Sequence, residues 1–326
     1  VFLRCAGFEA QHLQGFGLVH DTIMISSLLL VGLPVLFCLR VEAADQWQVA
    51  QVTGDLGDEC DDTADDGGDD IELAGTLSGS GKIIKQGNGS LKLTGNNTFQ
   101  GNTEVLAGIL ELAEPGRLGN GNYNGAISID ASGQVYINTS ANHIFSGAIS
   151  GSGDLVKDST GSLTISGDND LTGSLEVKDG LVVLDSSTTA VTGDSDISTA
   201  DVIVSGGTLL LDADEQLADD VDISITGGEF SLNGATESID GLSNSGGVFS
   251  TGIGGTLNVL GNTITWSGGT NTINDAATLA DTHWDVSGGT NTVEGGTTGG
   301  TLHVQSAGIG FEFTGSGTPN ITLNSD

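Results

Sequence analysis

The segment Trp266–Ile273 reads WSGGTNTI, and its core SGGTNT occurs again at Ser287–Thr292. This echo is part of a longer series of Ser/Thr-Gly-Gly triplets, which begin at Ser205, Thr226, Ser245, Ser267 and Ser287. Successive triplets start about 20 residues apart, and a regular period of this length is typical of a solenoid, in which one unit stacks on the next. The series therefore predicts one glycine corner per coil.

The residues around each triplet follow an alternating apolar pattern. The pattern occupies positions three and one before the triplet start, and four and six after it. These positions hold Val202, Val204, Leu209 and Leu211; Ile223, Ile225, Phe230 and Leu232; Leu242, Asn244, Phe249 and Thr251; Ile264, Trp266, Asn271 and Ile273; and Trp284, Val286, Asn291 and Val293. Since side chains of a strand alternate between two faces, the pattern indicates two strands flanking each corner. In a helix each glycine would cost about 1 kcal/mol.

The period also decides between the two ways of arranging such strands. A hairpin meander reverses direction at each turn, so equivalent residues need not stack. A parallel β-helix places each residue over its counterpart one coil earlier, about 4.8 Å away. We therefore predict an all-β fold, a single-stranded parallel β-helix with about 20 residues per coil. In this fold Asn271 lies over Asn291 with their amides bonded in a ladder, and Trp266 and Trp284 point into the core.

The first half of the chain repeats a longer unit. Gly79–Leu112 and Gly151–Leu184 superpose without a gap, so that Gly79 aligns with Gly151 and Leu112 with Leu184. In the first copy, the shared positions include Gly79, Gly81, Lys85, Gly89, Leu91, Gly95, Asn97, Gly101, Val105, Gly108 and Leu112. Glycine, lysine and asparagine are thus repeated together with the apolar residues.

This unit resembles the autotransporter-associated β-strand repeat of bacterial passenger domains. Glu215–Gly252 resembles the degenerate coils that follow such units in the same family. The resemblance implies a right-handed β-helix in an exported, Gram-negative-type surface or secreted protein. It implies no enzymatic activity, because these repeats are scaffold. Such proteins end in a membrane β-barrel, which we do not expect within this chain.

The amino-terminal part predicts export. Ile25–Leu39 is an apolar run of signal-peptide length, and Val41-Glu42-Ala43 places small residues where a signal peptidase reads. We assign residues 1–43 to a signal peptide, with Met24 as the candidate true start; an uncleaved membrane anchor is the alternative. Residues 44–71 are predicted to be an acidic, disordered linker, and 72–326 the β-helix. Of the three cysteines, Cys60 alone follows the leader, so no disulfide framework is expected.

The charge balance limits the partners. Against 43 acidic residues stand eight basic ones, a net charge of −35. Nucleic acid is excluded because phosphate binding needs clustered cations, and an anionic membrane surface would repel the chain. Surface glycans or an extracellular matrix are the candidate partners of a non-enzymatic scaffold or adhesin. Function would then be grafted onto insertions between coils, with Ala113–Ile144 the largest candidate and Asp212–Asp222 the next.

The alternative function is a polysaccharide-active β-helix enzyme, a lyase or a glycosidase. A uronate lyase needs a cation and a base, but the basic residues of the mature chain are few: Lys82, Lys85, Lys92, Arg117, Lys157 and Lys178. Lys85 and Lys157 are equivalent in the two repeat copies, which favours a structural role. A glycosidase needs two carboxylates flanking the bond. No catalytic residue is assigned from the sequence.

Calcium is the one candidate ligand. The candidates for a calcium site are Asp212, Asp214, Asp219, Asp220 and Asp222, which cluster after one strand. A second acidic stretch, Gly54–Asp70, carries nine acids and no base, but lacks the ligand spacing of a calcium loop. His143, His283 and His303 share no metal-ligand spacing.

Overall fold

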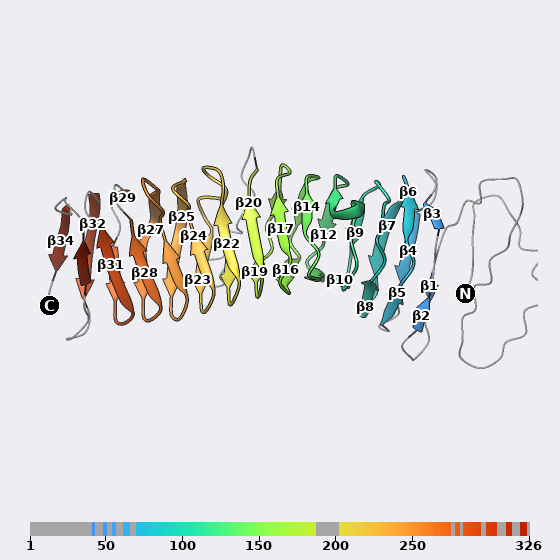
Figure 1. Ribbon diagram of the computed structural model, residues 1–326, viewed down its shortest axis with the longest axis horizontal. Helices are drawn as coiled ribbons and strands as arrows, with labels where there is room; N and C mark the ends of the chain where they lie inside the picture. The colour runs from blue at the N-terminus through green and yellow to red at the C-terminus, as the bar shows by residue number, and fades with distance from the viewer. Residues whose placement is uncertain are drawn as a thin grey trace, which may run out of the picture.

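The computed structural model describes residues 70–186 and 202–274 without interruption. It also describes the strands at 41–42, 48–50, 54–56, 61–65, 278–280, 298–304, 311–314 and 320–324, and residues 283–294. Side chains are described at 70–186, 202–261, 264–274 and 285–292. Within these ranges the chain forms an elongated rod of stacked coils (Figure 1).

Three parallel sheets form the sides of the rod. Sheet I contains β1 (Val41–Glu42), β4 (Asp61–Asp65), β7 (Lys82–Gln86), β9 (Thr103–Val105), β12 (Ile127–Ile129), β15 (Ile149–Gly151) and β18 (Asp170–Leu171). Sheet II contains β2 (Gln48–Ala50), β5 (Ile71–Leu73), β8 (Ser90–Leu93), β10 (Gly108–Ala113), β13 (Gly133–Asn138), β16 (Asp154–Asp158), β19 (Leu175–Val177), β21 (Val202–Val204), β23 (Asp222–Ile225), β25 (Thr236–Asn244), β27 (Thr256–Trp266), β29 (Thr278–Ala280), β30 (His283–Val286), β32 (Thr298–Val304) and β34 (Asn320–Asn324).

Sheet III completes the coil. It contains β11 (Asn122–Tyr123), β14 (His143–Phe145), β17 (Ser162–Ile165), β20 (Leu181–Leu184), β22 (Thr208–Leu211), β24 (Glu229–Ser231), β26 (Val248–Ser250), β28 (Thr270–Ile273), β31 (Thr290–Glu294) and β33 (Phe311–Thr314). A small sheet pairs β3 (Gly54–Leu56) with β6 (Leu77–Gly79), and the 3-10 helix η1 spans Gly119–Gly121.

Strand pairing shows how the coils stack. One coil runs through β9, β10 and β11, and the next through β12, β13 and β14, each strand pairing in parallel with its counterpart. Beyond β18, the long strands β25 and β27 pair along most of their length in sheet II. The parallel β-helix predicted from the sequence is confirmed, and so is its coil length of about 20 residues.

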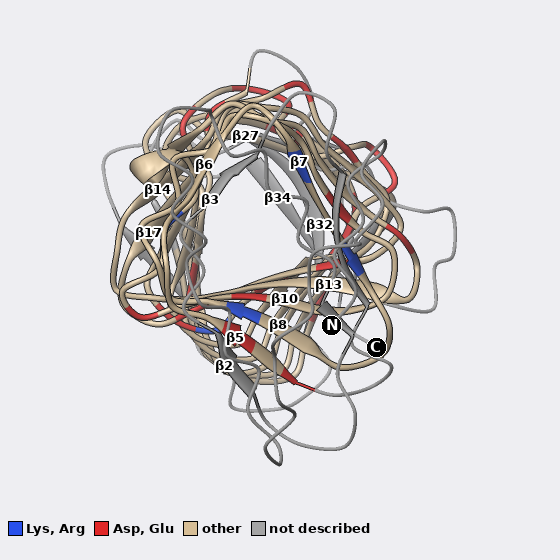
Figure 2. Ribbon diagram, turned by 90° about the vertical axis from the view of Figure 1, so that its right-hand side faces the viewer, with Lys and Arg blue, Asp and Glu red and all other residues tan. Residues whose placement is uncertain are grey.

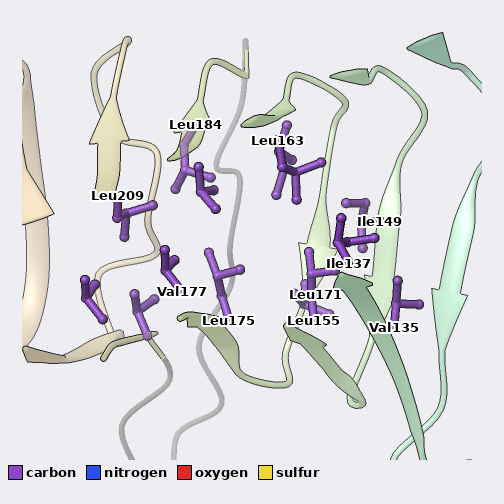
Figure 3. Close-up of a cluster of buried hydrophobic side chains, with 14 of the residues drawn as sticks. Val135, Ile137, Ile149, Leu155, Leu163, Leu171, Leu175, Val177, Leu184 and Leu209 are labelled. Atoms are coloured by element: carbon purple, nitrogen blue, oxygen red, sulfur yellow. The ribbon is translucent and has the colours of Figure 1, made fainter. Parts of the chain in front are cut away.

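The predicted inward columns are confirmed as well. Val204, Ile225, Asn244 and Trp266 are consecutive register partners, and each is 0% exposed. Figure 3 shows the same stacking of aliphatic side chains, such as Leu155, Leu175 and Val177, in the middle of the rod. Full burial of such a side chain contributes about 1.5–3 kcal/mol. The side chain of Trp284 lies outside the described residues.

The triplet glycines serve two different purposes. The second glycine has a left-handed backbone in four of the coils, with φ of 57° at Gly207, 61° at Gly228, 69° at Gly269 and 85° at Gly289. The first glycine lies against the coil below. A Cβ at Gly268, for example, would lie 2.0 Å from the carbonyl oxygen of Ser245. Since a side chain is strained at the second position and has no room at the first, the corner selects Gly-Gly.

The two copies of the long repeat lie on different sheets. Following sheet I from Ile83, the register passes through Thr103 and Ile127 to Ile149, three coils later. The repeat equivalent of Ile83 is Leu155, which lies on sheet II instead. In the same way β8 on sheet II corresponds to β17 on sheet III. The second copy is therefore displaced by three coils and one further side of the rod.

The prediction of an insertion at Ala113–Ile144 is wrong. This segment contains η1, β11, β12 and β13, and so it forms regular coils of the β-helix. The enlargement lies at the corner of η1, because the register partners Thr103 and Ile127 are further apart along the chain than Ile83 and Thr103, the partners one coil earlier. The repeat spacing is obscured there because the extra residues lie in the corner between two strands and leave the strands themselves in register.

The amino-terminal assignments stay predictions. The leader residues up to 40 lie outside the described residues, and of the acidic segment 44–71 the structure places β2, β3 and β4 in sheets with the following coils. No helix within the described ranges combines the length and apolar character needed to cross a bilayer.

Candidate functional site: the repeat corners and the outer face of sheet II

Lys85 and Lys157 are structural, as their equivalence in the repeat predicted. Both side chains are 0% exposed. The Lys85 ammonium donates to the carbonyl oxygens of Gln86 at 2.8 Å, Gly87 at 2.9 Å and, in the next coil, Ala107 at 3.1 Å. Each lysine thus ties the carbonyls of two successive corners together.

The second copy repeats this arrangement on another side of the rod. The Lys157 ammonium donates to the carbonyl oxygens of Asp158 at 2.9 Å, Ser159, and Asp179 at 3.4 Å in the next coil. Burial lowers the pKa of Lys157, partly offset by the carboxylates of Asp179 and Asp158. Because both ammonium groups are committed to main-chain oxygens, neither is available to bind a substrate carboxylate.

Asn97 and Asn169 provide a second structural pair. The side-chain oxygen of Asn97 accepts from the Leu77 N–H at 2.9 Å, and that of Asn169 from the Ile149 N–H at 2.7 Å. In each case the amide nitrogen donates to a carbonyl two residues earlier. Buried backbone groups without a partner are costly, so these asparagines satisfy the corners where the sheet ladder is interrupted.

The predicted asparagine ladder is confirmed and is longer than expected. Asn271 Nδ2 donates to Asn291 Oδ1 at 2.8 Å, and Asn244 Nδ2 donates to Asn271 Oδ1 at 2.7 Å. All three side chains are at most 1% exposed. The sequence pattern missed Asn244 because it precedes the glycine corner while the other two follow it.

The acidic segment Asp212–Asp222 contributes to the core as well as to the surface. Gln216, Leu217 and Val221 are buried within it. Asp214 accepts the Thr236 N–H at 2.7 Å, and Asp212 accepts from Asn233 Nδ2 at 3.4 Å. Among the described residues no three His, Cys, Asp or Glu side chains converge as metal ligands. Calcium binding by Asp212, Asp214, Asp219, Asp220 and Asp222 stays a prediction.

Beneath this segment lies a buried carboxyl group that the sequence did not indicate. Glu237 is 0% exposed and accepts the N–H groups of Gln216 at 2.8 Å and Leu217 at 3.2 Å. Gln216 is in turn bonded to Ser186 through both amide atoms. Burial raises the pKa of Glu237 to about 8, against the opposing effect of the two N–H groups. In the sequence Glu237 is one acid among many, and only its inward position distinguishes it.

The buried Glu237 carboxyl group should make the free energy of unfolding fall as the pH rises from the ordinary pKa of this group to its raised value in the folded chain. The folded chain holds the Glu237 proton up to a pKa of about 8, whereas the ordinary pKa of this carboxyl group is 4.5. Between these values the folded state binds more protons than the unfolded state, so its stability is greatest at the acidic end. Denaturation midpoints measured from pH 5 to 8 should show this decline in the wild type and a weaker decline in Glu237→Gln. The control, Glu229→Gln in the adjacent coil, should retain the wild-type dependence; equal profiles in all three proteins would contradict the assignment.

His143 is a core residue. It is 1% exposed, its Nδ1 lies 3.1 Å from the Ala141 carbonyl oxygen, and its ring meets that of Phe145 edge-on at 5.9 Å. Burial lowers its pKa to about 4, so the imidazole is neutral at neutral pH. His283 and His303 lie on β30 and β32, and their side chains are outside the described residues.

The outer face of sheet II carries a mixed aromatic and charged group, which we call the Tyr136 cluster: Glu111, Tyr136, Asp158, Glu176 and Lys178. The Tyr136 hydroxyl donates to Asp158 Oδ2 at 2.7 Å. Lys178 Nζ lies 5.9 Å from the centre of the Tyr136 ring and 3.2 Å from Glu176 Oε2. The hydrogen bond to Asp158, burial and the nearby carboxylates of Glu111 and Glu176 raise the pKa of Tyr136 to about 12.

The cluster covers an apolar residue. Val156 is the register partner of both Tyr136 and Glu176 and points outward, yet it is 2% exposed. Tyr136 from one neighbouring coil and Lys178 from the other meet above it. Among the described side chains Tyr136 is the only Phe, Tyr or Trp that is not buried. The sequence does not reveal this group because its members come from four coils.

Acidic and basic residues occur in strands and corners on several sides of the rod (Figure 2). The recurrent residues of the long repeat, by contrast, make contacts between coils. Residues 83–112 and 155–184 each match the model of the passenger-associated-transport-repeat, so the chain carries two copies of this autotransporter passenger repeat, and the resemblance noted in the sequence is confirmed.

A curated relative supports the same class. The chain is 29% identical over 110 residues to the protein named Adhesin BmaC autotransporter from Brucella suis biovar 1 (strain 1330). The match covers 28% of this chain and 3% of that much longer relative. No solved structure matches the chain at a significant level.

Proposed function

We propose that this protein is an exported, non-enzymatic β-helical rod that acts at the cell surface or in the medium as an adhesive or structural scaffold. The observation that carries the proposal is the repeat itself. Its recurrent lysines, asparagines and glycines contact the main chain of neighbouring coils, as Lys85, Asn97 and Gly101 illustrate. What is left for partners is the outer surface, presented along the length of the rod.

The relation to a protein named as an adhesin agrees with this role. Export through the predicted signal peptide, and surface glycans or matrix as the partners, are part of the same proposal. The commitment of Lys85 and Lys157 to main-chain oxygens argues against the alternative of a polysaccharide lyase, which needs a basic side chain at the substrate.

The proposal is tested by coupling the purified chain to fluorescent beads and measuring their retention on epithelial cells and on surfaces coated with matrix proteins or polysaccharides. We expect retention that excess soluble chain competes away, while beads coupled to serum albumin wash off. Incubation with uronate and neutral polysaccharides should release no reducing ends. Retention no greater than that of the albumin beads, or steady release of products, would overturn the proposal.

A further inference from the structure

Two members of the Tyr136 cluster, Asp158 and Lys178, are not required by the repeat. Within the repeat, Asp158 corresponds to Gln86 of the first copy, and Lys178 corresponds to Leu106. The structural position, by contrast, is a lysine in both copies, Lys85 and Lys157. Leu106 is 37% exposed in a position where the second copy places an ammonium group. Leucine therefore suffices at this position for the coil to form, and the cation has another use.

The chemistry of the cluster suits a positive charge. The face of an aromatic ring attracts an ammonium or guanidinium group, and nearby carboxylates strengthen this attraction. Here one tyrosine ring is surrounded by the carboxylates of Glu111, Asp158 and Glu176. The chain's own Lys178 already lies over the ring, which shows that a cation fits there. Lys178 is only loosely held, since its side chain is 40% exposed and its ion pair with Glu176 is partly exposed too.

We propose that the Tyr136 cluster binds a lysine or arginine side chain of a basic partner protein, and that Lys178 is an internal stand-in which the incoming cation displaces. This inference rests on the proposed role as a surface rod, and it names the class of partner. The net charge of −35 on the chain attracts basic surfaces from a distance, and the cluster then gives the attraction a specific position.

Binding is measured by calorimetry on the full chain with the peptide acetyl-(Gly-Arg)4-amide at low ionic strength, and with the (Gly-Gln)4 peptide as the uncharged comparison. Lys178→Gln empties the site. Its matched control is Lys82→Gln, which makes the same change in net charge and breaks a similar surface ion pair, Lys82 to Glu104 at 3.2 Å on sheet I. We expect Lys178→Gln to tighten arginine-peptide binding roughly threefold relative to Lys82→Gln, because an exposed cation–π contact is worth roughly 0.5–1 kcal/mol.

A second pair of variants tests the ring. In the Lys178→Gln background, Tyr136→Leu keeps an apolar cover over Val156 but removes the aromatic face, and should weaken peptide binding roughly two- to fivefold. Tyr136→Phe keeps the face and should bind within roughly twofold. Circular dichroism confirms that each variant is folded.

Three results would overturn the inference: equal affinities of Lys178→Gln and Lys82→Gln, insensitivity to Tyr136→Leu, or binding of a neutral oligosaccharide in place of the arginine peptide. The first two would mean that the acidic chain attracts cations without a site. The bead assay separates this outcome from the proposed function. If the wild-type and Tyr136→Leu beads adhere equally, the rod is adhesive and only the cation site is wrong; if neither adheres, the proposed function fails.

Discussion

Lys157→Met is expected to lower the free energy of unfolding by about 3 kcal/mol, because three corner carbonyls lose their shared donor at once. Methionine matches the apolar length of lysine and fills the same space, so the loss reports the ammonium group rather than a cavity. The carbonyls concerned, those of Asp158, Ser159 and Asp179, belong to two successive coils. Urea denaturation followed by circular dichroism measures the change.

The repeat supplies its own controls for this experiment. Lys85→Met removes the equivalent group from the first copy and should cost about as much, since its three bonds are of similar length. Lys82→Met removes a partly exposed lysine from the same strand and should cost less than about 1 kcal/mol. A loss as small in Lys157→Met as in Lys82→Met would show that water replaces the ammonium at the corner.

Gly173→Ala is expected to destabilise the rod by about 3 kcal/mol or more, because the added methyl group has no space. A Cβ at Gly173 would lie 2.1 Å from the carbonyl oxygen of Gly153 in the preceding coil. The obstructing atom is backbone, so only a displacement of one coil against the next relieves the clash. The equivalent glycine of the first copy, Gly101, meets Gly81 at 2.0 Å, so Gly101→Ala should behave in the same way.

A glycine on an open corner separates packing from backbone strain. Gly254 has a φ of 76°, and a Cβ there would meet no atom within 4 Å. Gly254→Ala should therefore cost only the strain of a left-handed alanine, about 1 kcal/mol. Equal denaturation midpoints for Gly173→Ala and Gly254→Ala would contradict the view that the repeat glycines are selected by the close approach of two coils.

Much of the fold could be predicted because it follows from alternation and period. The inward positions of Val204, Ile225 and Trp266 follow from the rule that neighbouring side chains of a strand point to opposite faces. The contact of Asn271 with Asn291 follows from the repetition of SGGTNT, since parallel coils place equal positions over each other. The structural role of Lys85 and Lys157 followed from their recurrence in the repeat, although their partners could not be predicted.

The prediction of an insertion failed for a related reason. The segment Ala113–Ile144 shows little of the repeat spacing, and its corner at η1 is enlarged, so its strands were not recognised. Apart from β13, its strands have only two or three residues, and such strands carry too few alternating positions to stand out from a Ser/Thr/Asn-rich background. Register between coils, and not local sequence, identifies them.

The sequence by itself determined the parallel β-helix, the length of its coils and the residues that fill its core, because a strand's inside and outside are set by neighbours along the chain. Only the tertiary structure decided on which side of the rod each repeat copy lies. The step from Ile83 to its repeat equivalent Leu155 ends three coils and one side further on, since corner lengths vary from coil to coil. For the same reason only the fold could bring Glu111, Tyr136, Asp158 and Lys178 together: they are neighbours across coils, where distance depends on the stacking of backbones and not on separation along the chain.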